Sequence, residues 1–99
     1  MVVVIFRSRL RQGANVEELT ALTERMYARV SAMPGFLRLK DFQADDGEAV
    51  SIAEFDSLEV ETAWRDDPEH RKAQQRGRTE FFSEYNIQVC TVMRDSHFP

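Results

Sequence analysis

Residues 15–35, NVEELTALTERMYARVSAMPG, decide the fold. Asn15 followed by Glu18 forms a capping box, which is typical of the start of a helix. Pro34-Gly35 ends the pattern, because proline cannot continue the hydrogen-bond ladder and glycine accepts the backbone angles of a helix end. The sequence therefore predicts a helix over Val16–Met33, with helically spaced apolar residues at Val16, Leu19, Leu22, Met26, Val30 and Met33.

Strand patterns lie on both sides of this helix. Met1–Leu10 is rich in β-branched residues and predicts a strand before it. Phe36–Ala44 and Glu48–Asp56 predict two more strands, joined at Asp45-Asp46-Gly47, because an Asp-Gly step between two such runs is a hairpin signal. Tyr85–Met93 predicts the last strand.

Between the third and the last strand the sequence predicts a helix in two pieces. Asp56 or Ser57 caps the first piece, which carries Trp64 near its end. Asp67-Pro68 breaks the helix and starts the second piece, with Asp67 as cap and Pro68 at the first helical position. The second piece carries His70, Ala73, Gln74, Gly77, Phe81 and Phe82.

This order, β-α-β-β-α-β, predicts a ferredoxin-like α+β fold in a single domain over residues 1–99. Both helices would cover one face of an antiparallel four-stranded sheet. The first and last strands carry apolar side chains on both of their faces, so the uncovered side would be a large exposed apolar patch. We therefore expect a homodimer in which two sheets pack face to face.

Composition narrows the possible partners. The 99 residues include 13 basic and 17 acidic side chains, a net charge of −4 that argues against a nucleic-acid partner. No apolar run approaches the roughly 18 residues of a membrane span, so no membrane partner is expected. A single cysteine, Cys90, and two distant histidines predict no disulfide and no metal site, and the expected compartment is the cytoplasm.

The residues that could carry chemistry gather around the helix break. Trp64 either clamps the helix on the sheet or forms the wall of a pocket for a flat ligand. His70 lies in the first turn of the second piece, where the helix dipole favours a neutral imidazole suited to a general base; the alternative is a surface or capping histidine. Gly77 in a helix interior indicates close approach by backbone or ligand, or helix–sheet packing without room for a side chain.

Several stretches resemble the antibiotic biosynthesis monooxygenase domain family: Val2–Leu10, Met33-Pro34-Gly35-Phe36, Ala63 to Arg71, and Ala73-Gln74 through Gly77-Arg78 to Tyr85. The resemblance implies a dimeric α+β barrel. It also implies oxygenation of a quinol-like or polyphenolic substrate by dioxygen without a cofactor. The roles that it implies are His70 as base, Trp64 as aromatic wall, Arg78 as phenolate partner, and Gln74, Phe81 and Phe6 as substrate-binding residues.

Two alternatives to this activity stay open. Related haem-degrading monooxygenases have an iron-ligating histidine ten residues after the tryptophan, where this chain has Gln74, and a strand asparagine where it has Ser8. Neither an amide nor a hydroxyl is a credible haem-iron ligand, so haem degradation is disfavoured. The other alternative is a small-ligand-binding or structural dimer without activity, and an RNA-binding module ranks third. The sequence leaves open whether the chain is an enzyme.

Overall fold

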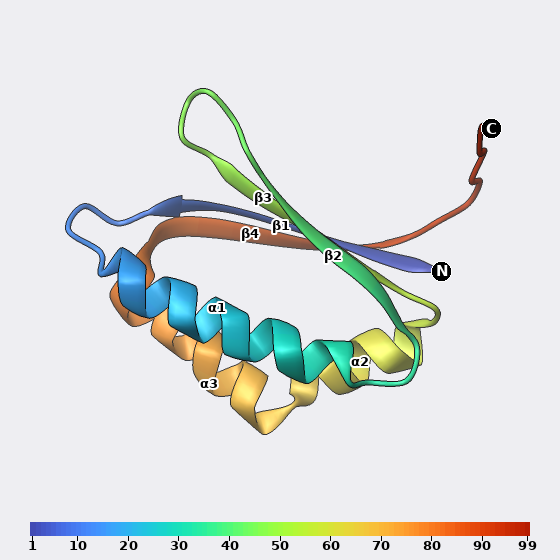
Figure 1. Ribbon diagram of the computed structural model, residues 1–99, viewed down its shortest axis with the longest axis horizontal. Coiled ribbons are helices and arrows are strands. Elements are labelled where there is room, and N and C mark those ends of the chain that lie inside the picture. The colour runs from blue at the N-terminus through green and yellow to red at the C-terminus, as the bar shows by residue number, and fades with distance from the viewer.

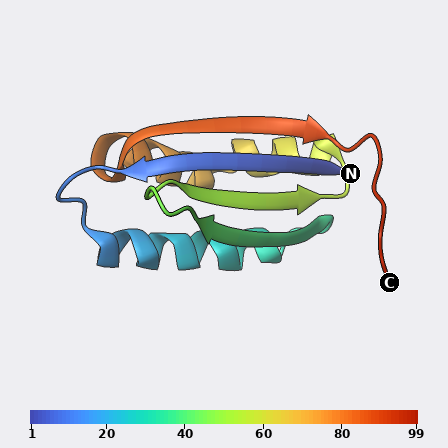
Figure 2. The same cartoon turned by 90° about the horizontal axis from the view of Figure 1, so that it is seen from above.

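The computed structural model describes residues 1–99 and contains a four-stranded antiparallel sheet, in the order β2-β3-β1-β4, with helices on one side of it (Figure 1, Figure 2). This is the ferredoxin-like α+β fold that the sequence predicts. The elements are β1 (Val2–Leu10), α1 (Val16–Ser31), β2 (Phe36–Gln43), β3 (Ala49–Phe55), α2 (Leu58–Asp66), α3 (Pro68–Arg76), the π-helical turn η1 (Gly77–Phe81) and β4 (Phe82–Thr91).

Short-range signals set most of the element ends. The Asn15 side chain accepts a hydrogen bond from the Glu18 N–H, as the capping box predicts. α1 nevertheless ends at Ser31 and not at Met33, because the Ala32 N–H turns back to the Arg29 and Val30 carbonyls in a tighter turn. None of the helices is long and apolar enough to cross a membrane.

The prediction was wrong about the start of the last strand. The second helical piece does not continue as an α-helix to Phe82; it ends at Arg76 and passes through η1. In this turn the Phe82 N–H donates a hydrogen bond to the Gly77 carbonyl, five residues back. Each turn of η1 therefore contains about one residue more than a turn of an α-helix. β4 consequently begins at Phe82, and it ends at Thr91, which leaves Met93 outside the sheet.

The core lies between the helices and the two central strands. Val30 of α1, Phe55 of β3 and Trp64 of α2 form its buried cluster, with exposed fractions of 1%, 1% and 8%. Val4 of β1 packs against them, and the other partly buried members are Met26, Met33, Phe36, Ala53 and Val60. Burial of these side chains holds all the helices to one side of the sheet.

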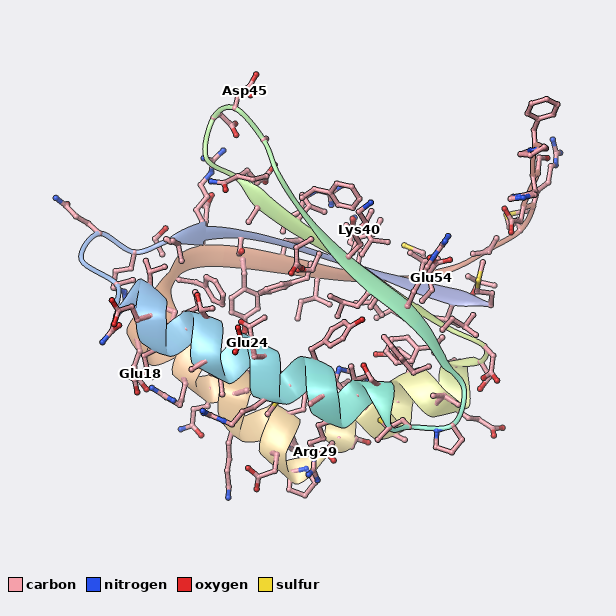
Figure 3. All side chains as sticks on the ribbon, in the orientation of Figure 1. Glu18, Glu24, Arg29, Lys40, Asp45 and Glu54 are labelled. Atoms are coloured by element: carbon pink, nitrogen blue, oxygen red, sulfur yellow. The ribbon has the colours of Figure 1, made fainter.

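The pairing register divides the strand residues between two faces, because side chains alternate along a strand. Val4 pairs with Ala53 and Val89, and Phe6 pairs with Ser51 and Ile87, so these residues face the helices. Lys40 and Glu54 lie on the opposite side (Figure 3). We call that side the open face; it consists of Val3, Ile5, Arg7, Arg9, Arg38, Lys40, Phe42, Val50, Ile52, Glu54, Glu84, Asn86, Gln88 and Cys90.

The turn between α1 and β2 is built around Gly35. Its φ of 93° is a left-handed backbone conformation, and its carbonyl accepts a hydrogen bond from the Asp56 N–H at 2.8 Å. A Cβ at this position would lie 2.7 Å from both an Asp56 carboxylate oxygen and a Val60 methyl carbon. The turn is therefore wedged against the start of α2, the helix that carries Trp64.

We predict that Gly35→Ala lowers the free energy of unfolding by about 2–3 kcal/mol, since it adds both backbone strain and a steric clash. Gly13→Ala is the matched control, because Gly13 has a φ of 80° but no heavy atom within 4 Å of the added Cβ. Urea unfolding of both variants measures the difference. An equal decrease in the free energy of unfolding for both variants would contradict the close packing of Gly35 against Asp56 and Val60.

Candidate functional site

The site begins at the helix break, where Asp67 makes three contacts through one carboxylate oxygen. Its Oδ1 accepts hydrogen bonds from the N–H groups of Glu69 and His70, both at 3.0 Å, which caps α3 as predicted. The same oxygen accepts a 2.8 Å bond from Nε of Arg29 on α1. These bonds, led by that of Arg29, hold the pKa of Asp67 below its ordinary value, so the carboxylate stays charged.

This cap sets His70 face to face with Trp64. The two rings stack with centroids 4.0 Å apart and planes inclined by 14°. Nδ1 of His70 lies 2.9 Å from the Trp64 carbonyl oxygen. A carbonyl only accepts hydrogen bonds, so Nδ1 carries the hydrogen, and in the neutral ring Nε2 then holds a lone pair. The arrangement provides a proton acceptor of fixed tautomer beside an indole ring.

The charge of His70 follows from its surroundings. Burial lowers the pKa of the imidazole, and it outweighs the Trp64 carbonyl and the Asp67 charge, which act in the opposite direction. The imidazole is therefore neutral near pH 7, as the sequence predicts, but the chief cause is burial and not the helix dipole. His70 is half-buried, which the exposed-looking sequence around it did not indicate.

A second group of residues lies at the far end of α3. Arg78 in η1 donates a hydrogen bond from its guanidinium to the Tyr85 hydroxyl at 3.0 Å. The Tyr85 ring lies 5.5 Å from that of Phe6 and 6.3 Å from that of Phe82. A cation, a phenol and two further aromatic rings thus meet at one end of the helix-facing sheet surface.

Arg11 holds this end of the site in place. Its guanidinium donates to the Thr79 carbonyl at 2.6 Å and to the Arg78 carbonyl at 2.9 Å. Its backbone N–H donates to the Phe81 carbonyl at 2.8 Å. Arg11 thereby satisfies carbonyl groups that an α-helix would otherwise have paired internally, and it orients the turn that carries Arg78.

His70 and Arg78 do not meet directly. Arg78 lies eight positions after His70 in the helical chain, which is about 12 Å along the axis. The surface between them is the helix-facing side of β1 and β4, where Val4 contacts the Trp64 cluster and Phe6 contacts Tyr85. On the neighbouring edge strand, Ile87 and Val89 are 44% and 46% exposed, so apolar surface remains accessible on this side.

The structure also places three further predicted residues. Phe81 is 1% exposed, with the Arg76 guanidinium 5.2 Å above its ring, so this side chain packs in the core and contacts no open surface. Gln74 is half-buried on α3, one turn after His70. The ring of Phe82 lies 3.0 Å from where a Cβ of Gly77 would be, so that glycine serves side-chain packing.

Sequence reasoning missed two residues at the site. Tyr85 was assigned only to a strand, and its contact with Arg78 depends on η1, which no sequence pattern indicated. Glu61 was not singled out, yet it is only 6% exposed, on α2 one turn before Trp64. Its position, three residues before an expected core tryptophan, was the one signal of burial.

Two surface hollows lie elsewhere. One, of about 640 Å³, opens beside the start of α2 and is lined by Ser57, Leu58, Glu59 and Thr62. The other, of about 230 Å³, is lined by Arg7, Ser8, Glu48, Glu84, Tyr85 and Asn86. Neither is lined by Trp64 or His70. Of the site residues described above, only Tyr85 lines one of these hollows.

The chain belongs to the antibiotic biosynthesis monooxygenase family, whose model matches residues 1–76. At the family level this membership supports a monooxygenase-like role. The match includes Trp64 and His70 and ends before Arg78. A sequence relative, the uncharacterised protein YqjZ of Bacillus subtilis, is 31% identical over 75 residues, which are 76% of this chain and 66% of the relative. The match thus spans slightly less than two thirds of YqjZ.

Solved structures share the fold. Rv0793 from Mycobacterium tuberculosis superposes with a TM-score of 0.82 at 21% identity, covering 97% of this chain and 98% of its own. The N63A mutant of SnoaB from Streptomyces nogalater, a cofactor-independent oxygenase, superposes with a TM-score of 0.79 at 17% identity. The superposition covers 95% of this chain and 94% of SnoaB. At these identities the likeness concerns the fold alone.

We predict that His70 titrates below its ordinary pKa of 6.5 and makes the fold acid-sensitive. Because the unfolded chain takes up this proton at higher pH, stability present above pH 6.5 is lost as the pH falls through the folded-state pKa. The slope is at most about 1.4 kcal/mol per pH unit. NMR titration of the imidazole, with His97→Gln for assignment, measures the pKa. A His70 pKa above 6.5 would refute the prediction.

Glu61 should affect stability in the opposite pH range. Burial raises the pKa of this carboxyl, so its stabilising contribution is complete below pH 4.5 and is lost as the pH rises through the folded-state pKa. Glu61→Gln is therefore predicted to raise the free energy of unfolding at pH 7 and to have little effect at pH 4. The exposed neighbour Glu59, changed to Gln, is the control in urea unfolding at both pH values.

Proposed function

We propose that this chain is a cofactor-independent monooxygenase that oxidises a quinol-like or polyphenolic substrate with dioxygen. The observation that carries the proposal is the His70 imidazole, neutral, stacked on Trp64 and tied through Nδ1 to a carbonyl. Such a ring accepts a proton through Nε2 near pH 7. The family membership and the fold shared with SnoaB, a cofactor-independent oxygenase, support the same reaction class.

The chemistry needs a base, a cation and an apolar surface. His70 Nε2 accepts a phenolic proton, and the resulting phenolate is electron-rich enough to pass an electron directly to dioxygen. The radical pair recombines at an aromatic ring carbon that bears one hydrogen, and the proton held by His70 converts the resulting peroxide into a hydroperoxide. Loss of water, which removes the second oxygen atom, that proton and the hydrogen of the carbon, leaves a carbonyl at this position. The Arg78 guanidinium stabilises the negative charge, and Phe6 and Trp64 border the flat substrate.

The spacing of these groups restricts the substrate. His70 and Arg78 lie about 12 Å apart along the helix, so one molecule reaches both only if it contains several fused rings. Between His70 and Arg78, the accessible side chains of Ile87 and Val89 provide an apolar surface on which a polycyclic substrate could lie. A single-ring hydroquinone would contact one end of the site only. We therefore favour polycyclic phenols over simple quinols.

We also propose that the chain acts as a homodimer joined through the open face. Val3, Ile5, Val50 and Ile52 are only partly buried there, and Phe42 is 47% exposed. A contiguous apolar centre of this kind, surrounded by charged side chains, is typical of a protein–protein interface. Because β1 contributes to both faces, such a dimer would stiffen the strand on which Phe6 lies.

A non-catalytic dimer that binds a small ligand is the second candidate. Trp64 is 8% exposed and belongs to the core cluster, and neither hollow described above is lined by it or by His70. These observations favour a packing role for the tryptophan. Binding of an aromatic ligand without oxygen uptake would support this candidate.

We predict oxygen consumption by the purified protein with polycyclic phenols and without added haem. His70→Ala should lower the rate about a hundredfold or more, and Arg78→Ala about tenfold to a hundredfold. Arg71→Ala is the control, since Arg71 is an exposed residue of α3, and its rate should be unchanged.

Full activity in His70→Ala would remove the proposed base. Activity that requires haem would contradict the cofactor-free reaction. No oxygen uptake with any hydroquinone or polyphenol, with or without haem, would favour the non-catalytic dimer.

A further inference from the structure

We propose that Glu61 is a substrate-binding residue whose carboxylate accepts a hydrogen bond from a phenolic hydroxyl group. The inference rests on the proposed function and narrows its substrate class. The ring that gives its proton to His70 carries a second hydroxyl group, and this second group binds to Glu61.

Glu61 is a buried carboxylate without a partner in the chain. It is only 6% exposed, yet it takes part in no ion pair, and no hydrogen bond reaches its carboxylate. Glu54, the other buried acidic residue at 9% exposed, forms an ion pair with Arg38. Burying a charged group is costly unless a hydrogen-bond donor compensates for the lost water. Glu61 therefore lacks a donor that a ligand can supply.

The chain itself offers no such donor near Glu61. Arg65, one turn further along α2, donates its Nε hydrogen to Asp66 at 3.2 Å. The Arg65 charge lowers the pKa of Glu61 and the Asp66 charge raises it, but burial is the largest cause and the pKa is raised overall. The helix-facing side chains of β1 and β4 carry no charge, and His70 is the other titratable group at this end of the site.

The carboxylate oxygens of Glu61 remain within reach of a ligand. Every side-chain nitrogen or oxygen atom that is closed off from solvent in this structure has a hydrogen-bond partner. The Glu61 oxygens have no partner, so they still touch accessible space although most of the side chain is buried. A hydroxyl group that enters this space meets an acceptor without displacing any protein contact.

The geometry of α2 directs Glu61 towards β1 and β4. Successive residues of an α-helix are rotated by about 100°, so Val60 and Glu61 lie on opposite flanks of Trp64. Val60 packs against Gly35, which precedes β2 at one edge of the sheet. Glu61 consequently faces the other side, where β1 and β4 lie (Figure 2). Leu58, further around this flank, is 57% exposed, so Glu61 is the buried residue that borders the opening.

The two ends of the site therefore differ in hydrogen-bonding character. His70 Nε2 and the Glu61 carboxylate are both acceptors beside Trp64, since His70 stacks on that ring and Glu61 lies one helical turn before it. The Arg78 guanidinium at the other end is a donor. The complementary ligand has two hydroxyl groups at one end, fused aromatic rings in the middle and an acceptor oxygen at the other end.

The first test compares two tricyclic phenols that differ by one hydroxyl group, anthracene-2,3-diol and anthracen-2-ol. Quenching of the fluorescence of Trp64, the only tryptophan, measures their dissociation constants in the absence of oxygen, so that no turnover occurs. The diol should bind about tenfold to a hundredfold more tightly, as expected for a hydrogen bond to a charged group. Glu61→Leu, which replaces the carboxylate by an apolar group, should abolish this preference.

Two further variants separate binding from folding. Glu61→Gln keeps an acceptor oxygen without the charge, and it should retain a preference for the diol of about twofold to tenfold. This variant removes a charge that burial disfavours, so its smaller preference does not arise from a weakened fold. Glu59→Gln is the control, because Glu59 is an exposed residue of the same helix, and it should leave both dissociation constants unchanged.

The second test follows the carboxyl carbon of Glu61 by NMR titration in the two complexes, with Glu61→Gln for assignment. Both phenols cover the carboxyl group, but only the diol donates the additional hydrogen bond, which favours the charged form. The pKa of Glu61 should therefore be lower in the diol complex than in the complex with anthracen-2-ol.

The outcomes separate this inference from the proposed function. Equal dissociation constants for the two phenols, a preference that survives in Glu61→Leu, binding of neither phenol, or equal pKa values of Glu61 in the two complexes would each overturn the role of Glu61. Oxygen uptake decides the proposed function separately. A preference that depends on Glu61, without oxygen uptake, would refute the monooxygenase and leave the hydroxyl-binding residue in place; oxygen uptake without the preference would do the reverse.

Discussion

The break between α2 and α3 is the constraint on which the site depends. Pro68 has no N–H to continue α2, and Asp67 before it takes an extended conformation, with φ −58° and ψ 129°. The chain therefore turns, and the Asp67 carboxylate caps the new helix while binding Arg29. In an unbroken helix, residue 70 would lie about 9 Å along the axis from residue 64. Only the break allows the two rings to stack at 4.0 Å.

β1 joins the candidate site to the proposed interface. Alternate residues of a strand point to opposite faces, so Val4 and Phe6 border the space beneath the helices, while Val3 and Ile5 lie on the open face. A second sheet packed on the open face would therefore restrain the backbone that positions Phe6. In the proposed dimer, this geometry would link assembly to ligand binding without any residue that takes part in both.

Local sequence patterns predict much of the fold but only part of the candidate site. Asn15, Pro34 and Pro68 act on residues within a few positions of themselves, so the ends that they set were predictable to within two residues. The sequence predicted a neutral His70 from the helix dipole, whereas burial, which comes from tertiary packing, is the chief cause that lowers its pKa. Phe81 was predicted to bind substrate, but it is 1% exposed and packs in the core at the end of η1, a π-helical turn that no sequence pattern indicated.

The sequence by itself determined the order of the elements, the helix break and the chemistry available at it, since periodicity, caps and turns depend on near neighbours along the chain. The tertiary structure alone decided which groups meet. The ion pair of Arg29 with Asp67, the bond from Arg78 to Tyr85 and the burial of Glu61 all require separate segments to pack in three dimensions. Such contacts arise from shape and solvent exclusion across the whole domain, and no local pattern encodes them.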